Sequence, residues 1–380
     1  MTRAGAANPT AGASHAAERS LRLRAALARA ARFEFWPGWA VYGPIMPWLA
    51  WLALRHGGAF VFLACNPAFE AGGGFVGERK SQLLGSSRHP LILPWTLLPA
   101  AVETRGEDDR VRESLSRLAR AGLRLPCIVK PDVGERGFNV RLARTEADVR
   151  GALREVRGGL IAQAYHPGPE ECGILWARTP GAPGGRILSV TRKQFPVIVG
   201  DGERTLGELI DDHPRFRLQR HVFRARHAAR LHTVVGAGER VRLSMSGNHC
   251  QGALFMDGAD LITPELSRVV GDLAESFADG GFDFGRFDVR FESEEKLRSG
   301  ESLAVVEVNG TSSESTNMYD PEKPLAWSLA VLARQWRVMY ELGAWRVRSG
   351  ARKPTLRDMR DIMRRADIAR RARGGSSLAD

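Results

Sequence analysis

The sequence lacks the cysteine and histidine patterns of zinc and thiol-redox proteins. It has four cysteines among 380 residues, with no CxxC pair, and its nine histidines form no HExxH motif. The cysteines lie far apart, at Cys65, Cys127, Cys172 and Cys250. This spacing gives no support to a zinc site or a redox pair, and scattered single cysteines are typical of a reducing cytosol. We therefore expect a cytoplasmic protein.

Long hydrophobic runs are also missing. The most apolar stretch, Trp39–Leu54, is interrupted by Pro44 and Pro47 and falls short of the roughly 20 apolar residues that span a bilayer. The N-terminus shows no small-residue cleavage site of a secretion signal. The tryptophans of this region favour either packing into the protein's own core or contact with a membrane surface; they are Trp36, Trp39, Trp48 and Trp51.

The phosphate-binding loop of P-loop proteins is absent as well. In the segment Gly72–Ser81 (GGGFVGERKS), Arg79 stands before Lys80 where that loop requires glycine. No helix-turn-helix or zinc-finger pattern occurs, so we expect no specific nucleic-acid partner. The formal net charge of +12 nevertheless favours ligands that carry phosphate, or an anionic membrane.

Changes of composition along the chain predict several zones. They are a basic arm over residues 1–34, a short Trp-rich segment over 35–74, a central domain over 75–325, and C-terminal helices with a basic tail over 326–380. Within the central domain we place one subdomain at about residues 126–190 and a second at about 191–325. The basic residues at both ends make 1–54 and 352–373 compatible with contact with an anionic membrane.

Hydrophobic periodicity predicts strands and helices in alternation. We expect strands at Ala59–Cys65, Leu125–Val129, Asn139–Ala143, Leu160–Tyr165, Gly173–Ala177, Ile187–Val190, Val197–Val199, Ala253–Met256, Arg286–Phe291 and Leu303–Val308. A helix begins near Thr145, where Asp148 completes a capping box. Further helices are expected at Pro264–Ala278 and Pro324–Trp345.

A strand that ends in lysine is followed by a loop with two glycines. In Ile128–Gly137 (IVKPDVGERG), Lys130 ends the apolar strand, and Gly134 and Gly137 lie in the loop. Glycine lets backbone amides approach phosphate oxygens, and lysine adds a positive charge. The segment predicts a phosphate site, with an ordinary hairpin carrying a surface lysine as the alternative.

Two later strands carry oxygen-bearing side chains at alternate positions. Alternation places Arg286, Asp288 and Arg290 on one face of the first strand, and Glu307 and Asn309 on one face of the second. If these strands pair, Asp288, Glu307 and Asn309 converge, and such hard oxygen ligands suit Mg²⁺. The alternative is a solvated sheet face with surface carboxylates.

A third segment, Gln163–Glu170 (QAYHPGPE), leaves a strand and turns at Pro-Gly. It is weaker evidence alone, because a plain turn has the same composition. In order, however, the three segments resemble the ATP-grasp superfamily, above all D-alanine–D-alanine ligase. Val199–Thr205 and Asn248–Gly252 are similar to cyanophycin synthetase. The resemblance covers about residues 75–325 and is most specific at Arg286–Val289 and Glu307–Asn309.

This resemblance implies an α+β, ATP-grasp fold in which two α+β subdomains clasp ATP. A short N-terminal segment and a basic C-terminal helical tail would flank it here. It implies an ATP- and Mg²⁺-dependent ligase that forms an acyl phosphate from a small-molecule carboxylate and joins it to an amine. Two Mg²⁺ ions are implied, and Mn²⁺ is compatible with the same ligands.

The resemblance also implies roles for individual residues. For the nucleotide they are Lys80 and Lys130 on the phosphates, Gly134 and Gly137 in a lid, Gln163 and Tyr165 at the adenine, and Glu170 at the ribose. Gln163 stands where the family more often has an acid. For the metal they are Asp288, Glu307 and Asn309, and Arg286 is the implied catalytic residue. Arg192 and Lys193 are candidates for phosphate or for a substrate carboxylate, or else mark a solvated strand end.

The sequence departs from the family at its start. Residues 35–74 stand where the family has a full α/β domain that helps to hold the substrate. The acid and the amine therefore cannot be carried over. Two alternatives remain: a peripheral membrane or nucleotide-binding protein whose ATP-grasp domain is degenerate, and nucleic-acid binding without catalysis.

Overall fold

The computed structural model describes residues 28–371 except 31, 135, 136, 138, 245, 246 and 279. The chain divides into two compact units. The smaller unit combines the residues up to Pro44 with Phe195–Met245, and the larger one combines Ile45–Gln194 with the residues from Ser246 onward. The inserted unit therefore interrupts the larger one in sequence, and each is described by itself.

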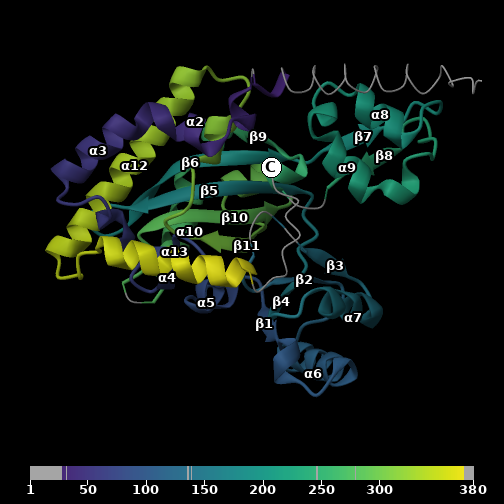
Figure 1. Ribbon diagram of the computed structural model, residues 1–380, viewed down its shortest axis with the longest axis horizontal. Coiled ribbons are helices and arrows are strands. Elements are labelled where there is room, and N and C mark those ends of the chain that lie inside the picture. Colours follow the sequence, from purple (N-terminus) through teal and green to yellow (C-terminus); the bar gives the residue numbers. More distant parts are fainter. Residues whose placement is uncertain are drawn as a thin grey trace, which may run out of the picture. The chain divides into compact units, whose positions relative to one another are not determined.

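A five-stranded antiparallel sheet forms the centre of the larger unit, in the order β11-β10-β5-β6-β9 (Figure 1). Its strands are β5 (Glu170–Arg178), β6 (Gly185–Gln194), β9 (Leu254–Asp257), β10 (Phe284–Phe291) and β11 (Leu303–Asn309). The helices of this part are α10 (Pro264–Glu275), α11 (Glu294–Arg298) and α12 (Leu325–Arg348). The mixed helix-and-sheet class expected from the sequence is thus confirmed.

The two faces of this sheet differ because side chains alternate along each strand. On β10, Phe287 and Val289 enter a core that also contains Leu266 and Val270 of α10. On the other face Phe284 packs in a second core with α12. Farther along the same face stand Arg286 and Asp288, as the alternation in the sequence predicted.

A second sheet of the larger unit has four antiparallel strands, in the order β1-β4-β2-β3. Its strands are β1 (Trp95–Leu98), β2 (Cys127–Pro131), β3 (Arg141–Ala143) and β4 (Leu160–Ala164). Helices α6 (Glu107–Arg120) and α7 (Glu146–Glu155) share its apolar core, and Thr145 caps α7 through the predicted capping box with Asp148. The subdomain boundary at about residue 190 stays a prediction; that residue lies within β6, which extends over Gly185–Gln194.

The smaller unit has an apolar core of its own, which contains Phe216 and Phe223. Its elements in the inserted segment are β7 (Val197–Val199), α8 (Leu206–Asp212), α9 (Arg220–Arg226) and β8 (Arg240–Arg242). Within this unit a buried ion pair joins the segment from Phe195 to Met245 to the N-terminal segment, because Arg215 Nη1 lies 2.7 Å from Glu34 Oε1. The unit is therefore held by both apolar packing and a buried ion pair.

One strand prediction is wrong. The expected strand Ala59–Cys65 is instead a 3₁₀ helix over Val61–Ala64 that packs against α12. Val61, Phe62 and Leu63 are all buried there. A short apolar run without alternation fits a buried helical turn as well as a buried strand, so periodicity cannot separate the two.

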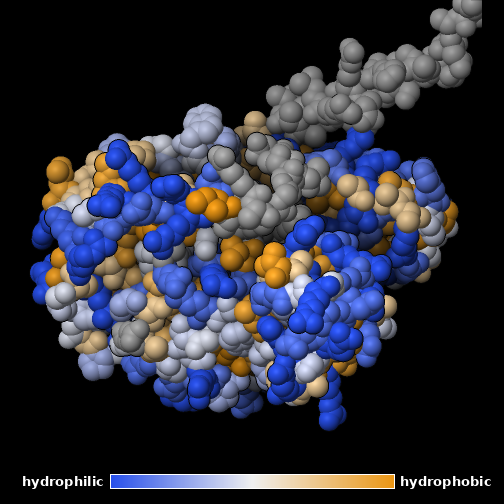
Figure 2. All heavy atoms as spheres, turned by 60° about the horizontal axis from the view of Figure 1, so that its bottom comes forward, coloured by the Kyte–Doolittle hydropathy of each residue, from blue (hydrophilic) through white to orange (hydrophobic). Residues whose placement is uncertain are grey.

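The Trp-rich segment forms short helices, α2 (Gly38–Tyr42) and α3 (Met46–Arg55). It is only partly packed: Trp48 donates from Nε1 to the carbonyl oxygen of Ala333, whereas Trp51 and Leu54 are 49% and 84% exposed. No helix among the described residues is long and apolar enough to cross a bilayer. On the face drawn in Figure 2, hydrophobic side chains form small separate groups among hydrophilic ones. Membrane contact through 1–54 and 352–373 stays a prediction, and residues 1–27, 372 and 373 lie outside the described part.

Three further helices are α4 (Glu70–Gly74), α5 (Lys80–Gly85) and, in the basic tail, α13 (Leu356–Arg371). The last three residues of α4, Gly72–Gly74, are called the glycine-rich turn. A Cβ added to Gly72 would lie 2.8 Å from Ile362 Cδ1 of α13, so glycine permits this close approach. On its other side the turn bonds to the loop after β11, because Thr311 donates its backbone N–H to Gly73 O at 3.0 Å.

Candidate active site

Two carboxylates lie directly opposite each other on neighbouring strands. In the β10–β11 register Asp288 pairs with Glu307, and Arg286 pairs with Asn309. All four side chains share one face of the sheet because these positions alternate with core residues. The structure therefore brings together the three predicted metal ligands and the predicted catalytic arginine.

A glycine on the adjacent strand makes room for this group. Gly173 of β5 lies opposite Asp288, and an added Cβ would stand 2.8 Å from Arg286 Cδ and 3.2 Å from Asp288 Oδ1. Any larger residue would push against the arginine and the carboxylate. The glycine thus leaves the polar face open where the two carboxylates meet.

Two cations hold the carboxylate of Asp288. Arg286 donates from Nε to Asp288 Oδ1 at 2.8 Å, and Lys193 Nζ lies 3.1 Å from Asp288 Oδ2. Burial opposes the charged form of Asp288, but Arg286 and Lys193 outweigh it and hold the pKa of Asp288 below its ordinary value. Asp288 therefore stays ionised at neutral pH, as a metal ligand must.

Lys80 joins the other carboxylate to the glycine loop. Its Nζ lies 3.1 Å from Glu307 Oε1 and donates to the carbonyl oxygen of Gly134 at 2.7 Å. Its backbone N–H donates to Asp132 O at 2.9 Å. Burial opposes ionisation of Glu307, but Lys80 outweighs it and lowers the pKa of Glu307. One lysine thus bonds a candidate metal ligand and a loop predicted to close over phosphate.

Lys130 is buried at the end of β2. Its Nζ donates to Gln163 Oε1 at 2.8 Å and to the carbonyl oxygen of Val306 at 2.7 Å. An ammonium has three donors, so one remains for a phosphate oxygen. Burial lowers the pKa of Lys130 to about 8, with Glu307 acting in the opposite direction. We call six side chains of this site the charged cluster: Lys80, Lys130, Lys193, Arg286, Asp288 and Glu307.

The pKa of Lys130 predicts that nucleotide affinity depends on pH. As the pH rises through about 8 the buried amine loses its proton, and with it the charge that attracts phosphate. We expect ATP affinity to fall between pH 7 and pH 9, by up to about tenfold per pH unit above the pKa. Lysines of ordinary pKa, near 10.4, would leave affinity flat over this range. Calorimetric titration of ATP at several pH values measures the effect, and a flat profile would contradict it.

The chemistry of the donor set suits Mg²⁺. Asp288, Glu307 and Asn309 offer carboxylate and amide oxygens, which hard divalent cations prefer. No group of three His, Cys, Asp or Glu side chains among the described residues could hold a metal ion. Phosphate oxygens would therefore have to complete the coordination, as is usual for Mg²⁺.

Other predicted nucleotide residues lie in varied surroundings. Gln163 faces the charged cluster through its bond with Lys130, whereas Tyr165 lines a cavity of about 430 Å³ together with Leu125 and Pro126. Glu170 is exposed at the start of β5. The side chains of Gln163 and Tyr165 thus have different contacts, although Gln163 lies in β4 and Tyr165 comes directly after that strand.

Arg192 and the predicted lid have different surroundings from Lys193. Arg192 bonds Asp260 and Glu294, so it does not join the charged cluster. In the lid, Gly134 is bonded to Lys80, and Gly137 adopts a positive φ of 70°. Glu135, Arg136 and Phe138 of the same loop lie outside the described residues.

Two acidic residues at this site were missed in the sequence. Glu171, next to the predicted Glu170, accepts from Lys193 Nζ at 2.9 Å. Glu78, two residues before Lys80, has its Oε2 atom buried without a hydrogen-bond partner among the described residues. Alternation along Gly173–Ala177 would have found Glu171 had the strand been extended to its true start at Glu170. Glu78 has no comparable signal, because its segment has no periodic pattern.

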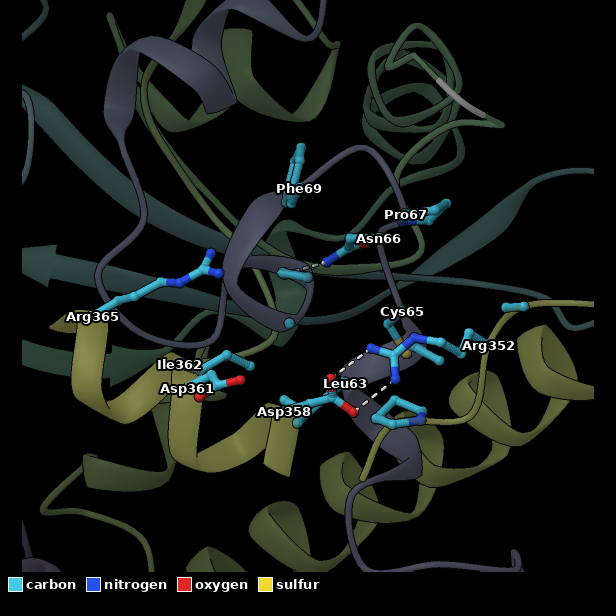
Figure 3. A pocket seen from close by; sticks show the side chains of 15 residues that line it. Leu63, Cys65, Asn66, Pro67, Phe69, Arg352, Asp358, Asp361, Ile362 and Arg365 are labelled. Carbon is cyan, nitrogen blue, oxygen red and sulfur yellow. Dashed lines mark hydrogen bonds and ion pairs between the residues drawn. The ribbon is translucent and has the colours of Figure 1, made fainter. Parts of the chain in front are cut away.

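A shallow cavity of about 360 Å³ lies behind the glycine-rich turn (Figure 3). Cys65, Asn66 and Phe69 line one side, and Ile362 and Arg365 of α13 line the other. Its wall includes Gly73, whose carbonyl oxygen also accepts from Thr311 in the loop after β11. Helix α13 thus borders the glycine-rich turn, which is hydrogen-bonded to the loop after β11.

No family model and no curated protein matches this chain. Solved structures do. The bifunctional glutathione synthetase of Pasteurella multocida has 14% identity and a TM-score of 0.33, covering 64% of this chain and 34% of that one. N5-carboxyaminoimidazole ribonucleotide synthetase, in its ADP complex, has 12% identity and a TM-score of 0.34, and the match covers 64% of this chain and 46% of that one. The L-amino acid ligase of Bacillus licheniformis has 12% identity and a TM-score of 0.35, and the match covers 68% of this chain and 47% of that one.

The chain spans less than half the length of each of these three proteins. With TM-scores of 0.33 to 0.35 the likeness is partial, and the argument for function rests on the charged cluster. The three solved structures are two synthetases and a ligase.

Proposed function

We propose that this chain is an ATP-grasp ligase, dependent on ATP and Mg²⁺, which forms an acyl phosphate from a carboxylate and transfers the acyl group to an amine. One observation carries the proposal. Lysines from three separate segments meet two opposed carboxylates: Lys80 at Glu307, Lys193 at Asp288, and Lys130 at the carbonyl oxygen of Val306. Positive side chains beside metal-binding carboxylates are what a triphosphate and its metal ions require.

The metal would be held by Asp288, Glu307 and Asn309, with two Mg²⁺ ions proposed and Mn²⁺ able to use the same ligands. When bound, it supplies charge neutralisation for the phosphoryl group that is transferred. The ionised state of both carboxylates, which Lys80, Lys193 and Arg286 maintain, supports this assignment.

The chain's own cations would act on the phosphates and on the acyl group. Lys80 and Lys130 neutralise negative charge on the triphosphate. Arg286 uses Nε and one terminal nitrogen on Asp288 and the other on the carbonyl oxygen of Glu314, at 2.8 to 3.5 Å. Since a guanidinium has five N–H donors, two remain for the oxygens of an acyl phosphate.

The loop that contains Gly134 and Gly137 would exclude water. An acyl phosphate is hydrolysed readily, so the carboxylate must be activated in a closed site. The bond from Lys80 to Gly134 O supports this role, because a residue that contacts phosphate would then also hold the loop. Adenine would lie near Gln163 and Tyr165, and ribose near Glu170.

The proposal is tested by a screen of amino acids, other small carboxylates and amines for ATP-dependent phosphate release, with mass analysis of the products. We expect one acid to stimulate release, and an acid–amine pair to yield a condensed product. ATP binding without release for any pair would favour the alternative of a degenerate nucleotide-binding protein. Absence of nucleotide binding would overturn both.

A further inference from the structure

Glu78 places a buried carboxyl group at the edge of the charged cluster. Its Oε2 atom is buried and has no hydrogen-bond partner among the described residues. The backbone N–H of Gly310, one residue after Asn309, is close enough to the carboxyl group to lower its pKa. Leaving a buried carboxylate oxygen without a donor is costly, so a missing donor is expected at this point.

The chain makes room for this carboxyl group by means of a glycine. A Cβ added to Gly74 would lie 2.5 Å from Glu78 Oε2 and 3.0 Å from Gly310 Cα. The Glu78 carboxyl group therefore packs directly against the loop that follows Glu307 and Asn309. Gly74 also has a φ of +78°, so both its backbone conformation and the lack of space disfavour a side chain at this position.

The nearby cations are engaged with other groups. Lys80 bonds Glu307 and Gly134 O, and Arg286 bonds Asp288. Among the described residues none donates a hydrogen bond to Glu78 Oε2. Its carboxyl group is nevertheless close enough to Lys80, Glu307 and Arg286 for each of them to influence its pKa. Burial raises that pKa to about 8, so the group alone is largely protonated at pH 7, and a cation beside it would favour the ionised form.

An alkylammonium group suits Glu78, because it brings both a positive charge and three N–H donors to an oxygen that lacks a donor. Its carbon chain would allow the rest of the molecule to reach the charged cluster.

We propose that Glu78 binds the ammonium group of a substrate and so determines which substrates this site accepts. This inference rests on the proposed ligase function. Either substrate could carry this ammonium group: the carboxylic acid that is activated, or the amine that attacks the activated acid. In the first case Arg286, which has free N–H donors, faces the carboxylate of the same molecule.

Calorimetry with the full chain, Mg²⁺ and a non-hydrolysable ATP analogue separates these sources. One arm compares alanine with propionate, glutamate with glutarate, and lysine with 6-aminohexanoate. The second arm compares propylamine and butylamine with the corresponding alcohols. In one arm we expect the ammonium-bearing member of a pair to bind more tightly than its counterpart.

In Glu78→Gln this preference should fall by about 10- to 100-fold, since a charge-assisted bond to a buried group is lost. The matched control is Glu70→Gln, which changes an exposed glutamate of the same segment and should keep the preference. Glu78→Ala removes the carboxyl group and is the second variant, to be used if Glu78→Gln does not fold. An unchanged preference in the folded variants, or no preference for an ammonium in either arm, would overturn the inference.

Failure of the inference and failure of the proposed function give different results. Neither Lys80 nor Lys130 forms a hydrogen bond or ion pair with Glu78 among the described residues, so Glu78→Gln should still bind the ATP analogue. Loss of ammonium preference with intact nucleotide binding supports the role of Glu78. A chain that binds no nucleotide refutes the ligase proposal, whatever it does with amines.

Discussion

Replacing Glu307 with glutamine is expected to reduce Mg²⁺-dependent phosphate release by about 10²–10³-fold, comparable to the loss of one preorganised charged or polar group at a reacting centre. Glutamine keeps the shape of the side chain and can still accept a hydrogen bond from Lys80, whose Nζ lies 3.1 Å from Glu307 Oε1. It removes the negative charge that faces Asp288 across the two strands. The fold should therefore survive while the metal site loses a ligand charge.

Steady-state phosphate release over a range of Mg²⁺ concentrations measures this effect. The matched control is Glu295→Gln, which changes an exposed glutamate of α11 on the outside of the same unit. Thermal unfolding of both variants should stay close to that of the unsubstituted chain. A Glu307→Gln variant that releases phosphate at the original rate would show that Glu307 holds no metal.

The alternation of side chains made part of this site predictable. Asp288 and Glu307 were recognised from local alternation, and the residues next to them in sequence, Phe287 and Val308, pair with each other and fill the core on the opposite face. A residue's face is fixed locally in a strand, so only the pairing of the two strands had to be assumed. The structure confirms that pairing, with Asp288 opposite Glu307.

Contacts between distant segments could not be predicted in the same way. The bond from Lys80 to Gly134 O joins residues 54 positions apart, and that from Lys130 to Val306 O joins residues 176 apart. Neither lysine lies in a periodic pattern that would fix its direction. Glu78 was missed for the same reason, since its position depends on the approach of Gly74 to Gly310.

The division into units was equally hidden. The segment from Phe195 to Met245 has its own apolar core and groups with the N-terminal residues, not with the strands on either side of it. Its sequence shows ordinary strand and helix patterns, and local patterns carry no information on which distant segment a core is shared with. The 3₁₀ helix at Val61–Ala64 was mistaken for a strand because burial on all sides removes periodicity.

Replacing Lys130 with methionine should weaken ATP binding by about 10- to 100-fold, the usual value of a hydrogen bond from a charged group. Lys130 is only 5% exposed, and its Nζ donates to Gln163 Oε1 and to the carbonyl oxygen of Val306. Methionine fills a similar volume but leaves both acceptors without a donor, so thermal stability should fall as well. The loss of ATP affinity is the larger effect, because phosphate oxygens lose a positive charge in a buried site.

The exposed Lys353→Met is the control, since it removes the same charge from the protein without touching the charged cluster. Calorimetry should give this variant the original Kd for ATP. The pH profile of ATP binding separates a phosphate contact from a structural role of Lys130. If Lys130 binds phosphate, the ATP affinity of Lys130→Met should no longer fall between pH 7 and pH 9. The reason is that this variant lacks the amine whose pKa lies near 8. A variant that binds ATP weakly yet keeps the original pH dependence would show that Lys130 supports the sheet and does not contact the nucleotide.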